Sequence, residues 1–110
     1  MTKEQLLHAL SIVKPLLDQA DPDWRVFGSA AAYLSGASQR KPHDLDIQLS
    51  LEGAILAEQL LAPYRLDKEQ PESGKYRSRR SHYEVEGIEI DLSGGLERLT
   101  PEGKWVKVEA

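Results

Sequence analysis

Three aspartates are the residues of this sequence whose type and spacing could do chemistry. Asp44 and Asp46 alternate with aliphatic residues, and Asp91 lies in a second stretch that alternates in the same way. On a β-strand, Asp44 and Asp46 would point to one side and lie roughly 6 to 7 Å apart, a separation that two divalent cations can bridge. Gathered carboxylates raise one another's pKa, so three of them near neutral pH favour bound Mg²⁺. The alternative is an acidic strand face that only contacts water.

Gly28 and Ser29 form a second signal, because they stand between a predicted strand and a predicted helix. Glycine lets the backbone approach a ligand closely, and the first N–H groups of a helix favour an anion. Combined with an acidic metal cluster, this turn predicts a phosphate-binding site, although Ser29 by itself is more typical of a simple N-cap. Arg40 and Lys41 precede the acidic strand and could reach a triphosphate or an acceptor, or be ordinary loop charges.

A group of basic residues lies in a predicted extended segment and consists of Lys75, Arg77, Arg79 and Arg80. If this segment is a strand, Lys75, Arg77 and Arg79 share one face. They could contact a triphosphate or an anionic acceptor, or they could keep an edge strand from aggregating. His82 follows them without a recognisable metal-ligand spacing.

Hydrophobic spacing predicts the elements that must hold these residues. The first is an amphipathic helix, indicated by the apolar stripe Leu6, Leu10, Val13 and Leu17. Pro15 should kink or split this helix, and residues 21–23 should end it. Residues 24–27 predict a buried strand that Gly28 closes. A short helix should follow, with Ser29 as its N-cap and Gly36 as its left-handed C-terminal residue.

The later elements follow from the same reasoning. Residues 44–49 alternate strictly and predict a strand, 50–62 predict a helix that Pro63 ends, and 64–66 predict a short extended segment. Residues 75–84 should be extended, 85–92 should form a better strand that Gly94 and Gly95 break, and 105–108 an edge strand. The fold class is therefore α+β, a small mixed β-sheet with helices mainly on one face and the acidic residues on its open side.

Composition limits the classes of protein to which this chain can belong. The chain has 110 residues, of which 40% are hydrophobic. This composition predicts one domain over residues 1–110 and no membrane span. A formal charge of −4 argues against general nucleic-acid binding, which depends on Lys and Arg contacts to phosphates. The absence of cysteine excludes thiol chemistry and leaves oxygen and histidine nitrogen as metal ligands. A polar N-terminus without a signal-peptide pattern predicts a cytoplasmic protein.

Four short motifs in a fixed order resemble a known superfamily. They are Val26-Phe27-Gly28-Ser29, Leu34-Ser35-Gly36, His43-Asp44-Leu45-Asp46-Ile47 and Ile88-Glu89-Ile90-Asp91-Leu92. Together they are similar to the nucleotidyltransferase superfamily that includes DNA polymerase β, and most similar to its minimal prokaryotic members. The resemblance implies a nucleotidyltransferase-like fold. It also implies Mg²⁺-dependent transfer of a nucleotide from a nucleoside triphosphate such as ATP to a hydroxyl of a protein or small molecule.

The resemblance further implies a role for individual residues. Asp44 and Asp46 would coordinate two Mg²⁺ ions, and Asp91 would complete the metal site or take the proton of the acceptor hydroxyl. Gly28 and Ser29 would hold the β- and γ-phosphates of the nucleotide. Arg40 is a further candidate for nucleotide binding because of its position before the acidic strand.

The sequence departs from the family pattern in two places. His43 stands where the family usually has a small hydroxylated residue, and only 18 residues follow Leu92, where many members carry a helical domain that binds the base and the acceptor. A partner protein or a homodimer is therefore expected to complete the site. Some minimal members are antitoxins and others have lost catalysis. The chain could thus also be a non-catalytic nucleotide- or protein-binding module, such as a regulatory or antitoxin subunit.

Overall fold

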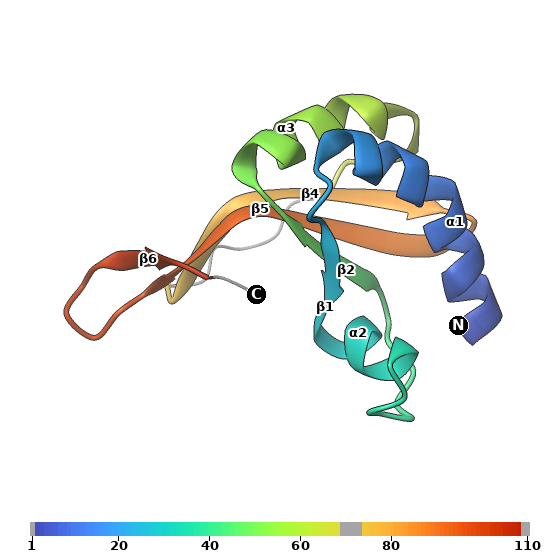
Figure 1. The fold of residues 1–110 in the computed structure, drawn as a ribbon, viewed down its shortest axis with the longest axis horizontal. Helices are drawn as coiled ribbons and strands as arrows, with labels where there is room; N and C mark the ends of the chain where they lie inside the picture. Colours follow the sequence, from blue (N-terminus) through green and yellow to red (C-terminus); the bar gives the residue numbers. More distant parts are fainter. Residues whose placement is uncertain (1, 69–73, 109–110) are drawn as a thin grey trace.

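The computed structural model describes residues 2–68 and 74–108 (Figure 1). The elements are α1 (Lys3–Ala20), β1 (Arg25–Phe27), α2 (Gly28–Leu34), β2 (Leu45–Leu49), α3 (Leu51–Leu60), a 3₁₀ turn (Ala62–Tyr64), β3 (Arg65–Leu66), β4 (Tyr76–Val85), β5 (Ile88–Leu99) and β6 (Trp105–Lys107). This is the α+β fold that the sequence predicts, with one mixed sheet. None of the helices in the described ranges is long and apolar enough to cross a membrane.

The sheet places β2 and β5 side by side at its centre. Its strand order is β1-β2-β5-β4-β3, and β6 pairs with β5. The β2–β5 pair is parallel and the other pairs are antiparallel. Helices α1 and α3 pack together over one face of the sheet, and α2 lies beside β1 and β2 (Figure 1). The parallel arrangement of β2 and β5 positions the candidate site.

The core lies between this sheet and helices α1 and α3. Leu45, Ile47 and Leu49 of β2 are buried on the helix side, as their alternation with polar residues predicts. The buried positions of α1 form one stripe, which consists of Leu6, Ala9, Val13 and Leu17. Because successive residues of a strand point to opposite faces, burial of the aliphatic residues leaves the acidic ones on the open face.

The prediction that Pro15 splits the first helix is wrong, because α1 continues from Lys3 to Ala20. Pro15 is exposed and lies on the side of α1 away from the core. A proline inside a helix removes one backbone hydrogen bond. The packing of the buried stripe on both sides of Pro15 compensates for that loss, because tertiary packing supplies most of the stability of a helix.

The prediction of a strand over residues 85–92, broken by Gly94 and Gly95, is wrong at both ends. Val85 belongs to β4, and Glu86 and Gly87 form the turn to β5 with φ angles of 53° and 76°. Positive φ at both central positions is typical of a two-residue hairpin turn. Gly94 does not end the strand, since β5 continues to Leu99. The missing side chain of Gly94 instead allows α3 to pack closely against β5.

Gly94 is expected to be among the least replaceable residues of the sheet. A Cβ atom there would collide with the Cβ atom of Ala54 on α3. We expect Gly94→Ala to lower the free energy of unfolding by about 2 kcal/mol or more, as overpacking does in cores. Urea denaturation measures this change, with Gly74→Ala as the matched control because a Cβ at Gly74 would contact nothing. Equal stability of the two variants would contradict the close α3–β5 packing.

Candidate active site

The parallel pairing of β2 and β5 brings the three predicted aspartates together. Asp46 lies directly opposite Asp91, and Asp44 immediately precedes β2. One carboxylate oxygen from each of the three residues lies within 4.8 Å of the other two. They line a cavity of about 280 Å³ together with Phe27, Arg80, Leu92 and Ser93. The three carboxylates thus form one cluster on the open face of the sheet.

The electrostatics of this cluster favour a bound cation. Burial, and then the charge of Asp44, raise the pKa of Asp46 from 3.8 to about 6, against the opposing charge of Arg80. Burial also raises the pKa of Asp91, to about 7, with a further contribution from Asp44. A divalent cation would offset both the desolvation and the mutual repulsion. Carboxylate oxygens are the ligands that Mg²⁺ prefers, so this donor set fits the predicted metal.

His82 is a residue of the site that the sequence analysis missed. It lies opposite Asp91 in the β4–β5 register, only 3% of its surface is exposed, and its Nδ1 atom is 2.6 Å from Oδ1 of Asp91. The signal that could have found it is the turn at residues 86–87, since counting outward from that turn places His82 beside Asp91. A ligand atom of Glu89 lies within 4.8 Å of the ligand atoms of His82 and Asp91, and its carboxylate forms an ion pair with Lys68.

Gly28 and Ser29 lie at the start of α2, next to the aspartates. Gly28 has a φ angle of +70°, and a Cβ atom there would lie 3.3 Å from Oδ2 of Asp46. The backbone therefore passes close to the cluster at a position that suits glycine. Ser29 is not the N-cap that the sequence predicts, because Phe27 occupies that position and no side chain caps the helix. The helix begins two residues earlier than predicted, which places the exposed Ser29 in its first turn.

Arg40 is not brought to the aspartates. It lies exposed in the loop between α2 and β2, where its backbone N–H donates to Oγ of Ser38, and it does not line the acidic cavity. Its predicted role in nucleotide binding stays a prediction.

The basic residues of β4 separate instead of forming the one predicted face. The register against β5 shifts between Arg77 and Arg79. Arg77 pairs with Glu97 of β5 and lies over the ring of Trp105, and Arg79 forms an ion pair with Glu58 of α3. Arg80 lines the acidic cavity, which sequence reasoning did not single out from the other basic residues.

Comparison with known proteins supports the fold. No protein-family model matches this chain, and no curated protein matches it significantly. A solved structure from Thermotoga maritima, described as a putative nucleotidyltransferase, matches 97% of this chain with a TM-score of 0.76 and 23% sequence identity. The chain shares the fold of that protein. It spans 66% of that protein's length.

Proposed function

We propose that this protein transfers a nucleotide from a nucleoside triphosphate to a hydroxyl acceptor with the help of Mg²⁺. The observation that carries the proposal is the convergence of Asp44, Asp46 and Asp91 on the open face of a fold shared with a protein described as a putative nucleotidyltransferase. The glycine turn beside these carboxylates adds a surface that suits phosphates.

The aspartates would hold the metal. Asp44, Asp46 and Asp91 would together hold two Mg²⁺ ions. When bound, the ions neutralise the triphosphate and lower the pKa of the acceptor hydroxyl. Gly28 and Ser29 would bind the β- and γ-phosphates through backbone N–H groups and the serine hydroxyl, and Arg40 would contact the nucleotide from its loop.

Asp91 would accept the proton of the acceptor hydroxyl, and His82 would hold Asp91 in position. The bond from the acceptor oxygen to the α-phosphorus forms while the bond to the pyrophosphate oxygen breaks, and the hydroxyl proton passes to Asp91. The contact with His82 Nδ1 occupies one oxygen of Asp91 and holds the carboxylate in place, which leaves its other oxygen for the cation or the proton. A partner protein or a second copy of the chain would complete the acceptor surface.

Calorimetry tests this proposal without knowledge of the acceptor. ATP, GTP, CTP and UTP are each titrated into the protein with Mg²⁺ and with EDTA, beside the double variant Asp44→Asn/Asp46→Asn. We expect Mg²⁺-dependent binding of at least one nucleotide. The double variant should lose this binding, because its neutral amides cannot hold the cation. The matched control is Asp23→Asn/Asp67→Asn, which removes two exposed carboxylates outside the cluster.

Failure of all four nucleotides to bind would contradict the proposal. Binding that persists unchanged in the double variant would place the nucleotide away from the aspartates. Binding without release of pyrophosphate, even with added cell extract as a source of acceptors, would instead support a non-catalytic nucleotide-binding module.

A further inference from the structure

The proposed function leaves one row of side chains on the open face without a role. Two residues beyond Asp46 on β2 lies Gln48, and Ser93 of β5 is its direct partner. Arg25 of β1 lies opposite Gln48 on its other side, and Arg80 of β4 lies opposite Ser93. Paired residues share a face of a sheet and alternate residues return to it, so this row faces the same side as the aspartates. We call these four residues the donor row.

The donor row carries hydrogen-bond donors, whereas the neighbouring row carries the carboxylates of Asp46 and Asp91. Its members carry two guanidinium groups, an amide and a hydroxyl, all of which donate hydrogen bonds. Arg80 and Ser93 line the acidic cavity, and Arg80 is close enough to Asp46 to lower its pKa. The row therefore begins inside the candidate active site, roughly 6 to 7 Å along the strands from the carboxylates.

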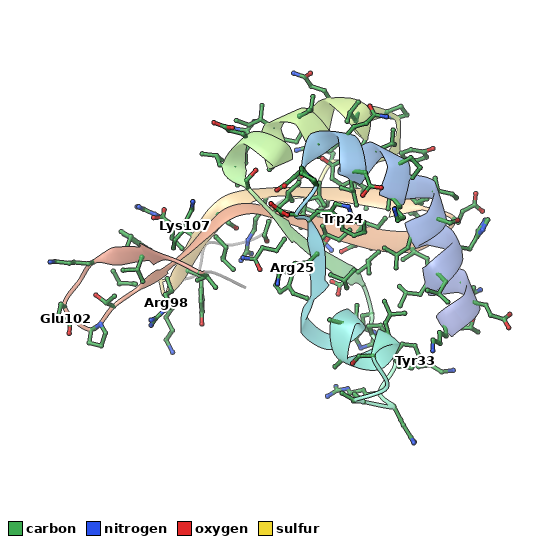
Figure 2. The ribbon with its side chains drawn as sticks, in the orientation of Figure 1. Trp24, Arg25, Tyr33, Arg98, Glu102 and Lys107 are labelled. Carbon is green, nitrogen blue, oxygen red and sulfur yellow. The ribbon has the colours of Figure 1, made fainter. Side chains whose placement is uncertain are left out.

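The other half of the donor row opens into a second cavity. This cavity has a volume of about 440 Å³ and is lined by Arg25 and Gln48, among others. It lies where the strand that pairs with β5 changes from β2 to β6. Pairing with β2 ends at Gly94, and pairing with β6 starts at Glu97. Lys107 of β6 is a further cation that lines this cavity. Figure 2 labels the side chains of Arg25 and Lys107.

Two carboxylates also line this second cavity, and neither belongs to the donor row. The side chain of Asp21 is occupied, because its two oxygens accept the backbone N–H groups of Asp23 and Ser50. Asp23 is exposed at the rim. Gln48 uses one of its donors on the backbone oxygen of Val108, which orients its amide toward β6. Arg25 and Lys107 are the cations that line this second cavity, and Arg80 is the cation that lines the acidic one. Because charge-assisted hydrogen bonds from such groups are strong, the donor row suits an oxyanion.

The position of the donor row indicates which substrate it contacts. In the antiparallel pair of β1 and β2, Phe27 lies opposite Asp46. Gly28, which follows Phe27, is therefore on one side of Asp46, and Arg25, which precedes Phe27, is on the other side. Phosphoryl transfer places the attacking and leaving oxygens roughly in line, on opposite sides of the phosphorus. If the triphosphate tail lies at Gly28, the acceptor approaches from the donor row.

We infer that the acceptor carries an oxyanion, a phosphate or a carboxylate, close to its reacting hydroxyl, and that the donor row binds this group. The inference rests on the proposed function for the identity of the acceptor side. The binding of an oxyanion by the row itself does not require metal or nucleotide.

NMR titration of the metal-free protein with inorganic phosphate tests the inference, with acetate in a parallel titration. We expect saturable changes in the amide signals of Gln48 and Ser93. Arg25→Gln and Arg80→Gln should each weaken phosphate binding about tenfold, because each removes a charge-assisted hydrogen bond. Arg98→Gln is the matched control, since it removes an exposed arginine of β5 that lines neither cavity. The anion that binds more tightly identifies the acceptor group as phosphate or carboxylate.

Several results would overturn the inference, and they differ from failure of the proposed function. Equal phosphate binding by Arg25→Gln, Arg80→Gln and Arg98→Gln, the absence of binding, or changes confined to Gly28 and Ser29 would each exclude the donor row as an oxyanion site. Mg²⁺-dependent nucleotide binding in the same protein would then leave the proposed function intact. Phosphate binding at the row without any nucleotide binding would instead refute both the transferase and the acceptor assignment.

Discussion

Asp46→Asn is expected to reduce nucleotidyl transfer about a thousandfold or more and, at the same time, to stabilise the metal-free protein. Transfer is lost because the neutral amide cannot hold a cation, and the metal supplies several kcal/mol of transition-state stabilisation. Stability rises because burial and the charge of Asp44 disfavour the ionised carboxylate, whose pKa is about 6. After allowance for solvent screening, the gain is about 1 kcal/mol near pH 8.

Two measurements check these opposite effects on one variant. Release of pyrophosphate from the nucleotide that calorimetry identifies measures transfer. Thermal unfolding in the presence of EDTA measures the stability of the metal-free protein. Asp67→Asn, which neutralises an exposed carboxylate, should leave both values unchanged. Transfer at the native rate would remove Asp46 from the catalytic machinery, and a lower melting temperature of Asp46→Asn would contradict the repulsion between the carboxylates.

The metal-free protein is expected to lose stability as the pH rises from about 5 to about 8. Asp46 and Asp91 have pKa values of about 6 and about 7 in the folded protein, above their ordinary value of 3.8. The folded state therefore binds protons more tightly than the unfolded state. The resulting stabilisation is complete below about pH 4 and is lost as the pH rises through the folded values, by about 1 to 2 kcal/mol after allowance for solvent screening.

Mg²⁺ should reverse this pH dependence. Cation binding requires the ionised carboxylates, so added Mg²⁺ should raise the melting temperature near pH 8 and have little effect near pH 5. Thermal unfolding across this pH range, with Mg²⁺ or EDTA, measures both trends. Asp91→Asn should flatten the metal-free profile between about pH 6 and pH 8, because it removes the group with the higher pKa. A profile that is flat in the unmodified protein would contradict the raised pKa values of Asp46 and Asp91.

The local sequence pattern was sufficient to predict most elements of the fold. Strict alternation in residues 44–49 identified β2 and the side to which Asp44 and Asp46 point, because a strand with one buried face admits only one placement of its aliphatic residues. The same pattern around Asp91 identified the central part of β5. Element boundaries were harder to predict, since packing on α3 lets β5 continue past Gly94 and packing of α1 outweighs Pro15.

Local patterns were thus enough to predict the α+β class, the strands that carry the three aspartates and the turn at Gly28. Which residues meet across strands became clear from the folded sheet. His82 reaches Asp91 because the hairpin turn lies at residues 86–87, and Arg80 enters the cavity while Arg79 turns to α3. These contacts depend on register, and a register that joins distant segments is decided by the packing of the whole sheet, not by a local pattern.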